Sequence, residues 1–222
     1  QKEESFIEKS TKVITVSQEF IDEVVERTKI EPEKIVLVPN TIRKSFYSKA
    51  IIDVNIINRY KEDFVILYVG DTHLRRGLQT AIRSVKVISK QIKNLKLVIV
   101  GSNTTDALLK KEVKELGVEN FVDFEGWQNV SLFPSYIKAS SICISPLHRN
   151  KQHDVAYANK VFQYMSFAKP LLVSNAIAQK KLVERVQSGL VHKEKDSQDF
   201  AEKVLTLYNN KQLSVSLGEN GK

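Results

Sequence analysis

Two neighbouring arginines follow the first strongly apolar run of the chain. The segment DTHLRRG places Arg75 and Arg76 directly before Gly77, and the residues after Gly77 have the apolar spacing of a helix. Guanidinium groups bind phosphate oxygens through paired hydrogen bonds, and the amino terminus of a helix favours the same negative charge. The segment therefore predicts a phosphate-binding loop. The alternative is an ordinary loop with two solvated arginines, since charged residues are common in such loops.

A second polar segment, residues 148–160, reads HRNKQHDVAYANK and leads into the helical pattern NKVFQYMSFAKP. Connections in α/β proteins usually have about two to six residues, so we expect a binding loop here, the alternative being a surface excursion. A helix that begins near Asn159, a residue type favoured at helix starts, leaves its first N–H groups unpaired. The N–H groups expected to favour an anion belong to Tyr157, Ala158, Asn159 and Lys160.

The elements that must position these residues alternate from residue 63 onward. Short β-rich runs are separated by longer segments of helical period, which is typical of a parallel sheet with crossover helices. The runs are FVILYVG, LKLVIVG, FVDFEG, SICIS, PLLVS and GLVH. The first is continuously apolar, as expected for a strand that is covered on both faces. We therefore predict an α/β fold with a Rossmann-like, doubly wound parallel sheet and a ligand at the carboxyl ends of its strands.

Residues that favour sharp turns mark the predicted strand ends. Gly70, Gly101 and Gly126 close the first three strands, while Ser145 and Ser174 close the fourth and fifth. One such glycine indicates only a turn with positive φ, but three at one edge favour a ligand surface. The G-x-G-x-x-G spacing of dinucleotide-binding enzymes and the Walker phosphate loop are both absent from the sequence.

The first 42 residues contain too few elements to enclose a core of their own. The predicted elements are a strand at Lys12–Ser17, a helix at Gln18–Arg27 and a strand at Lys34–Val38. We interpret residues 1–42 as the tail of a preceding domain, residues 43–62 as a linker with a short helix around Ile51–Tyr60, and residues 63–222 as the ligand-binding domain. The start QKEESFIEKS has neither an initiator Met nor the apolar stretch of a signal peptide, so we expect a fragment of a longer protein.

Composition argues against several classes of protein. The chain has 222 residues, 42% of them apolar, which is enough for a sizeable core. Its longest apolar run, Phe64–Val69, is far shorter than the roughly 20 residues of a membrane-spanning helix. The net charge of +8 is spread along the chain without an RNA-binding signature or zinc-ligand spacing, so we expect no nucleic-acid partner. The single Cys143 excludes an internal disulfide and indicates a reducing, cytoplasmic location.

The order of several motifs is similar to that of one enzyme family. The runs VITVS, KIVLVPN, ILYVG, RRG and LVIVG, the pair GW, and NKVFQYMSFAKPLLVSN followed by GLVH resemble the carboxyl-terminal two thirds of the retaining nucleotide-sugar glycosyltransferases of group 1 type. That family has two Rossmann-like domains, the GT-B architecture. The resemblance covers nearly the whole chain. It implies that residues 63–222 are the carboxyl-terminal domain, which holds the nucleoside diphosphate of a UDP-sugar or GDP-sugar donor, and that residues 1–42 end the acceptor-binding domain.

The resemblance also assigns residues to the donor diphosphate. By position these are Arg76, with Arg75 as a helper, together with Gly70, Lys160 and the helix start at residues 157–160. The family often has an arginine directly after the glycine of the first strand, where this chain has Asp71. That difference weakens the phosphate clamp or shifts its work to Arg75.

Two further positions correspond to the nucleobase pocket of the family. Gly126 and Trp127 match the loop after the third strand, where backbone groups can contact the edge of a base. A single Trp after a strand is as often a packing residue, so both interpretations stay open.

The most recognisable feature of the family is a pair of glutamates eight positions apart, one near the sugar hydroxyls and one that holds the ribose. The ribose position is Gln163 here, which keeps an acceptor oxygen but loses the charge. The sugar position is Val155, which cannot replace a carboxylate. The adjacent Asp154 and His153 are the candidates for a catalytic role, and the alternative is that both are exposed loop residues.

The resemblance implies transfer of a sugar to the hydroxyl of a glycan, lipid-linked or small-molecule acceptor with retention of configuration. No cofactor and no metal are expected, because cationic side chains can neutralise the leaving diphosphate. The chain would work with the missing amino-terminal domain, in the cytoplasm or in peripheral contact with the inner face of the membrane, and would be inactive alone. The leading alternative is a non-catalytic binding or assembly module, which the departures at Asp71 and Val155 favour.

Overall fold

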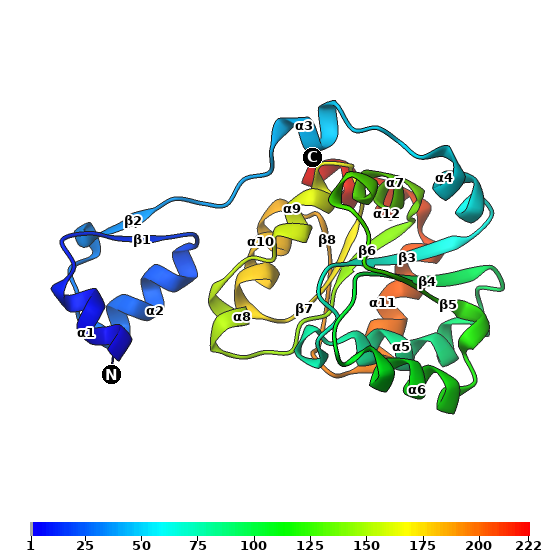
Figure 1. Ribbon diagram of the computed structural model, residues 1–222, viewed down its shortest axis with the longest axis horizontal. Helices are drawn as coiled ribbons and strands as arrows, with labels where there is room; N and C mark the ends of the chain where they lie inside the picture. Colours follow the sequence, from blue (N-terminus) through cyan, green and yellow to red (C-terminus); the bar gives the residue numbers. More distant parts are fainter. Residues whose placement is uncertain (1) are drawn as a thin grey trace.

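A computed structural model describes residues 2–222 and contains a parallel sheet of six strands (Figure 1). The strands are β3 (Phe64–Val69), β4 (Leu95–Val100), β5 (Val122–Gly126), β6 (Ile142–Ser145), β7 (Leu171–Ser174) and β8 (Gly189–His192). They lie in the order β5-β4-β3-β6-β7-β8, and all neighbouring pairs are parallel. The strand order reverses between β3 and β6, as in a doubly wound Rossmann-like sheet. The predicted fold class is confirmed.

Helices cover both faces of this sheet. On one face lie α5 (Leu78–Ile88), α6 (Asp106–Leu116), α11 (Ser197–Asn209) and part of α12 (Lys211–Gly221); on the other lie α4 (Val54–Tyr60), α7 (Phe133–Ala139), α9 (Asn159–Met165) and α10 (Ile177–Val186). Strand β3 contributes to both layers, since Ile66 and Tyr68 pack into the first core and Val65, Leu67 and Val69 into the second. Successive side chains of a strand point to opposite faces, which explains why the run is apolar throughout.

Short helical turns join several of these elements. The 3-10 turns are Pro32–Lys34, Leu74–Arg76, Glu119–Phe121 and Val130–Leu132. The polar segment before α9 contains a short helix, α8 (Lys151–Val155), so its interpretation as a loop is wrong in this part. The reason is a helix cap, because the side-chain oxygen of Asn150 accepts a hydrogen bond from the N–H of His153 (2.9 Å).

A smaller unit precedes the sheet in the chain. It contains α1 (Lys2–Lys9), β1 (Val13–Thr15), α2 (Gln18–Thr28) and β2 (Ile35–Leu37). Ile7, Val24, Ile30 and Ile35 form a small core of its own, so the expectation that this part encloses no core is wrong; helix α1 adds the buried Ile7. The strands pair in parallel, so the two predicted strands and the helix between them are confirmed, whereas α1 was not predicted. In Figure 1 this unit lies beside α8, where the hydroxyl of Tyr157 donates to the carboxylate of Glu19 (2.9 Å).

The linker between the two parts contains α3 (Lys44–Ser48) and leads into α4. Helix α4 packs on α7 and buries Ile56 and Tyr60 in the second core. The carboxylate of Asp53 accepts a hydrogen bond from the N–H of Asn55 (2.8 Å) and so caps α4. Helix α4 therefore contributes to the packing of the larger domain, while α3 is mostly exposed. Among residues 2–222, no helix is long and apolar enough to span a bilayer.

Candidate functional site

The loops that follow β3 and β6 touch at the reversal of the strand order. Gly77 has a φ of 76°, and a Cβ atom at this position would lie 1.8 Å from the carbonyl oxygen of Pro146. The N–H of His148 also donates to the carbonyl of Arg75 (3.0 Å). The two loops are thus in direct contact, and a side chain at Gly77 would force them apart. Together they form one continuous surface at the carboxyl edge of the sheet.

Lys160, from the first turn of α9, reaches back over β3 to this surface. Its Nζ lies 3.5 Å from the centroid of the Tyr68 ring, and a Cβ atom added to Gly70 would lie 3.1 Å from the same Nζ. Within the part of the chain that the structure describes, this ammonium has neither a hydrogen-bond partner nor an ion-pair partner. Desolvation and the nearby charge of Arg76 hold the pKa of Lys160 well below its ordinary value.

Arg76 lies beside this lysine and is held by the carboxylate of Asp71. The distance from Arg76 Nε to Asp71 Oδ2 is 3.1 Å, and the same carboxylate accepts from the amide of Asn103 (2.7 Å) and the N–H of His73 (3.2 Å). Burial alone would raise the pKa of Asp71, but the hydrogen bonds from Arg76 and Asn103 outweigh it and the pKa is lowered. The negative charge of Asp71 thus offsets the positive charge of Arg76, at the position where the family that the sequence resembles often has a second arginine.

The structure therefore brings together Gly70, Arg76 and Lys160, three of the residues assigned to the diphosphate. Arg76 and Lys160 both lie at this site, and Asp71 forms an ion pair with Arg76 but makes no hydrogen bond or ion pair with Lys160 in the described part of the chain. An anion with several oxygen acceptors would complete the hydrogen bonding of both. Arg75 points elsewhere, because its Nη1 donates to the side-chain oxygen of Gln152 in α8 (3.0 Å).

Gln163 opens onto a groove next to this site. The groove has a volume of about 360 Å3 and is lined by Thr41, Ile42, Arg43, Ser45, Phe46, Val130, Asn159 and Gln163. No side chain caps the start of α9, whose preceding residue Ala158 has an extended backbone. The polar residue in an otherwise apolar helix turn is thus explained by its position, since Gln163 faces a groove while Val161 and Met165 are buried.

The loop after β5 reaches the same groove only in part. Gly126 ends the strand with a φ of 66°, and Val130 from this loop lines the groove. Trp127 is 73% exposed and is not among the lining residues. The structure therefore does not pack Trp127 as a core anchor, and its contact with a nucleobase stays a prediction.

The two candidates for the missing glutamate have different surroundings in α8. The carboxylate of Asp154 accepts hydrogen bonds from the guanidinium of Arg149 (3.1 to 3.3 Å) and from the N–H of Ile177 (3.1 Å) at the start of α10. These contacts give Asp154 a role in joining α8 to α10.

His153 is buried in the same helix rather than exposed. Its Nδ1 lies 2.6 Å from the carbonyl oxygen of His148 and 3.0 Å from the side-chain amide nitrogen of Asn150. The Nε2 atom is buried and has no partner among residues 2–222. Burial lowers the pKa of His153, which favours the neutral ring. The structure therefore buries His153 within α8, and His153 is not among the residues that line the groove.

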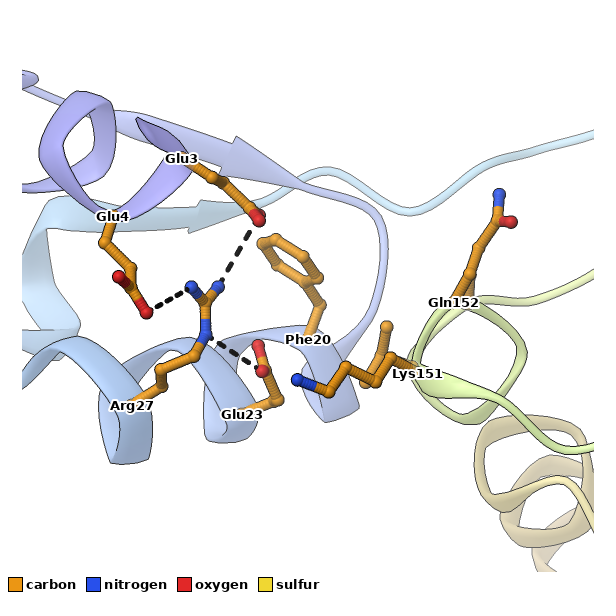
Figure 2. Close-up of a pocket in the computed structure, with 9 residues that line it drawn as sticks. Glu3, Glu4, Phe20, Glu23, Arg27, Lys151 and Gln152 are labelled. Atoms are coloured by element: carbon orange, nitrogen blue, oxygen red, sulfur yellow. Dashed lines mark hydrogen bonds and ion pairs between the residues drawn. The ribbon is translucent and has the colours of Figure 1, made fainter. Parts of the chain in front are cut away.

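A cleft of about 520 Å3 separates α8 from the smaller unit (Figure 2). On one wall, Arg27 lies among three carboxylates, with nitrogen-to-oxygen distances of 3.5 Å to Glu3, 3.1 Å to Glu4 and 3.0 Å to Glu23. Lys151 and Gln152 lie on the opposite wall. Because Gln152 also binds Arg75, this cleft adjoins the edge of the sheet.

Sequence reasoning missed this cleft and the contribution of residues 41–46 to the groove. The only signal for the cleft was the run of acidic and basic residues in the first 31 positions, which equally fits a solvated helix surface. The linker carried no signal, because its residues approach α9 only in the folded protein.

Comparisons with known proteins agree on one family. Residues 51–222 match the family described as glycosyl transferases group 1. The chain is 25% identical over 161 residues to the capsular polysaccharide biosynthesis glycosyltransferase CapM of Staphylococcus aureus, an alignment that covers 72% of this chain and 41% of CapM. The chain spans about two fifths to one half of the length of the curated relatives it matches.

Solved structures share the fold at lower identity. HepE from Anabaena in complex with UDP superposes with a TM-score of 0.82 at 17% identity, over 97% of this chain and 59% of HepE. HepE in complex with UDP-glucose gives a TM-score of 0.80 at the same identity, over 96% of this chain and 58% of HepE. The carboxyl-terminal domain of the group 1 glycosyl transferase LpcC from Francisella tularensis gives 0.66 at 18% identity, over 82% of this chain and 94% of that domain.

Proposed function

The chain belongs to the group 1 glycosyl transferases, and from this membership we propose that its larger domain binds a nucleoside diphosphate sugar at the carboxyl edge of β3 and β6. In this proposal the larger domain is the carboxyl-terminal, donor-binding domain of a GT-B enzyme, and the complete protein transfers the sugar to an acceptor hydroxyl with retention of configuration. Retention and the nature of the acceptor rest on the motif resemblance alone.

The position of the Lys160 ammonium close to the guanidinium of Arg76 is the observation that carries this proposal. An ammonium that is packed on an aromatic ring without a carboxylate partner costs the folded protein free energy. A diphosphate between Lys160 and Arg76 would offset that cost. Gly70 leaves the space that Lys160 needs to reach this position.

The chemistry of the transfer explains why the cations belong there. The bond between the anomeric carbon and the diphosphate oxygen breaks, and its electron pair stays on the diphosphate. Lys160 and Arg76 are fixed in advance where this negative charge develops, so they stabilise it without reorganisation. Metal independence stays a prediction; among residues 2–222 no three His, Cys, Asp or Glu side chains gather as a ligand set.

The groove next to this site supports a place for the nucleoside. In the proposal, Gln163 accepts a hydrogen bond from a ribose hydroxyl, and the base lies toward Gly126 and Val130. UDP and UDP-glucose are the ligands of HepE, which supports a uridine donor here.

The acceptor is proposed to enter through the cleft between α8 and the smaller unit, and residues outside this chain would complete its site. The name of CapM supports a glycan as the product class. We propose that the chain alone binds donor without turnover. The proposed place of action is the cytoplasm or the inner face of the membrane, where the buried thiol of Cys143 stays reduced.

Arg76→Ala is expected to weaken the binding of UDP or GDP, whichever binds the wild type better, by about 10- to 100-fold. A charge-assisted hydrogen bond contributes roughly 1.5–3 kcal/mol, which corresponds to this loss. Asp71→Asn has the opposite expected sign and should tighten binding by about two- to fivefold, because it releases Arg76 and removes a negative charge near the phosphates. Titration calorimetry at one salt concentration measures both, and equal binding by Arg76→Ala and wild type would remove its role.

Asp154→Asn is expected to destabilise the protein by about 1 kcal/mol, or roughly 2–4 °C in Tm, because it weakens the contacts to Arg149 and Ile177. Glu184→Gln is the control. In the part of the chain that the structure describes, the carboxylate of Glu184 forms only an exposed pair with Lys180 (3.9 Å), so the substitution should change stability by less than about 0.5 kcal/mol. Nucleotide-sugar affinity should be unchanged. A tenfold loss of nucleotide-sugar affinity with unchanged UDP affinity would instead give Asp154 a contact with the sugar.

The second candidate function is a non-catalytic binding or assembly module. The observations that favour it are the neutralisation of Arg76 by Asp71 and the engagement of Asp154 within the fold. A thermal-shift screen of nucleoside diphosphates separates the two. A nucleotide that raises Tm supports the donor site, whereas the absence of any shift with UDP, GDP, ADP and CDP supports the module.

A further inference from the structure

In the structure the two parts are joined by residues 38–53, between β2 and α4, and this linker forms one wall of the groove that contains Gln163. Its contribution consists of Thr41, Ile42, Arg43, Ser45 and Phe46, and the larger domain contributes Val130, Asn159 and Gln163. Figure 1 shows the linker passing from β2 to α3 before it turns toward α4. The groove is therefore built by two parts of the chain that are far apart in sequence.

Contacts on both sides of the lining segment hold the linker in place. The side-chain amide of Asn40 donates to the side-chain oxygen of Asn159 in α9 (3.2 Å). The ring of Phe46 packs edge to face on Phe167, with 6.0 Å between ring centroids, and joins the second core. Because Asn40 and Phe46 flank residues 41–45, the linker wall has a defined position over α9.

Arg43 is the one charged side chain among the residues that line this groove. Its carbonyl accepts the N–H of Phe46 (2.9 Å) at the start of α3, while its guanidinium has no acidic partner in the described range 2–222. The other polar groups are the neutral amides of Asn159 and Gln163 and the hydroxyls of Thr41 and Ser45. No carboxylate in the lining competes for the guanidinium.

This combination suits a flat, neutral ring with carbonyl oxygens at its edge. Phe46 and Val130 offer apolar surface to the faces of such a ring, and Arg43 offers hydrogen-bond donors without any acceptor. Uracil and guanine carry carbonyl oxygens at their edges, whereas adenine presents an amino donor beside its ring acceptor. The guanidinium of Arg43, which only donates hydrogen bonds, should therefore bind uracil or guanine better than adenine.

We propose that Arg43 binds the nucleobase of the donor through its carbonyl oxygens, so that the linker between the two domains selects the nucleotide. This inference rests on the proposed donor site and adds a residue outside the Rossmann-like domain to it. It also assigns the base class, a ring with carbonyl groups at the exposed edge.

The test compares Arg43→Gln with Lys44→Gln. The second substitution also removes one positive charge, but at the neighbouring position, whose side chain does not line the groove. Titration calorimetry with UDP, GDP, ADP and inorganic pyrophosphate measures the affinities. Arg43→Gln should lose about tenfold for the better of UDP and GDP, the free-energy scale of one charge-assisted contact. Pyrophosphate and ADP should change less than twofold. Lys44→Gln should match the wild type for all four ligands.

The outcomes separate this inference from the proposed function. Equal UDP and GDP affinities in Arg43→Gln and Lys44→Gln, with a clear loss in Arg76→Ala, overturn the inference alone. An equal loss for pyrophosphate in Arg43→Gln also overturns it, because the residue would then act on phosphate. Absence of binding of any nucleoside diphosphate to the wild type overturns both.

Trypsin provides a second measurement that needs no variant. Arg43 and Lys44 are exposed at the start of α3, and cleavage after either residue requires local unfolding of this segment. A nucleotide held by Arg43 opposes that unfolding and should slow cleavage by about tenfold at ten times Kd. Cleavage after Lys90 or Lys93, in the exposed turn before β4 at the opposite edge of the sheet, should keep its rate. Unchanged cleavage at Arg43 and Lys44 with saturating UDP or GDP would contradict the linker contact.

Discussion

Lys160→Met is expected to weaken UDP or GDP binding by about 100-fold and to leave the ligand-free protein as stable as the wild type or more stable. The binding loss follows from removal of a charge-assisted contact to the diphosphate, worth roughly 1.5–3 kcal/mol. Methionine keeps the length of the side chain and its contact with the Tyr68 ring. A loss of nucleotide affinity without a loss of stability distinguishes a lysine that binds ligand from one that stabilises the fold.

The stability effect of this substitution should depend on pH. The pKa of Lys160 in the folded protein lies well below its ordinary value of 10.5, because of desolvation and the charge of Arg76. The unfolded chain therefore binds the proton more tightly, and the wild type gains stability as pH rises from the folded pKa toward 10.5. Lys160→Met lacks this gain, so its advantage is largest at pH below the folded pKa and shrinks toward pH 10.5. Urea unfolding at several pH values, without nucleotide, measures it.

Lys180→Met is the matched control for Lys160→Met. Lys180 is exposed on α10, and among residues 2–222 its ammonium forms only a long ion pair with Glu184 (3.9 Å). It should change neither nucleotide affinity nor the pH dependence of stability. If Lys160→Met instead keeps its affinity and loses stability, the ammonium serves the fold.

The second large effect concerns Glu125, whose carboxylate joins three elements of the larger domain. It accepts hydrogen bonds from the hydroxyls of Tyr136 (2.5 Å) and Tyr60 (2.8 Å) and from Nη1 of Arg59 (2.7 Å). These partners lie in α7 and α4, and Glu125 lies in β5. Burial alone would raise the pKa of Glu125, but the two tyrosine hydrogen bonds and the charge of Arg59 outweigh it and place the pKa below 4.5.

Glu125→Ala is expected to destabilise the protein by about 3 kcal/mol, or roughly 6–12 °C in Tm. It leaves the hydroxyls of two buried tyrosines and a guanidinium without their acceptor. Glu125→Gln keeps one acceptor oxygen and should lose less. Because the folded pKa is lowered, the contribution of Glu125 is present above pH 4.5 and is lost as pH falls through the folded value. Thermal and urea unfolding at pH 7 and in acid measure both effects.

Glu115→Ala is the control for Glu125→Ala. Glu115 is exposed on α6, and within the described residues its carboxylate pairs only with Lys111 (3.6 Å), so its loss should change stability by less than about 0.5 kcal/mol. A similarly small effect of Glu125→Ala at pH 7 would contradict the role of the carboxylate as a joint between α4, α7 and β5.

Much of the fold could be predicted from sequence because strands that are buried on both faces leave continuous apolar runs. The run FVILYV is one such strand, and both of its faces pack into cores as expected. Helices α1 and α8 could not be predicted in the same way. Both are short and mostly polar, and α8 is fixed by the cap of Asn150 and by contacts with α10.

The candidate site could be predicted as a set of positions but not as an arrangement. Gly70, Arg76 and Lys160 meet at one edge because parallel strands end there, which the alternation of elements indicates. The turn of Arg75 toward Gln152 and the approach of Arg43 to Gln163 depend on tertiary packing. No local pattern in the sequence carries that information.

From the pairing of β3 with β6 we expect an order in which the site assembles during folding. Strands β3, β4 and β5 follow one another in the chain with one crossover helix in each connection, α5 and α6, whereas Ile66 of β3 pairs with Ile142 of β6 across a much longer stretch of chain. Gly70 is present in the early half of the sheet, but Lys160 reaches it only when β6 and α9 have docked. A chain arrested with β3 to β5 formed would hold Arg76 and lack its partner cation. Nucleotide would then stabilise only the complete sheet. Bound nucleotide should therefore slow unfolding more than it speeds folding.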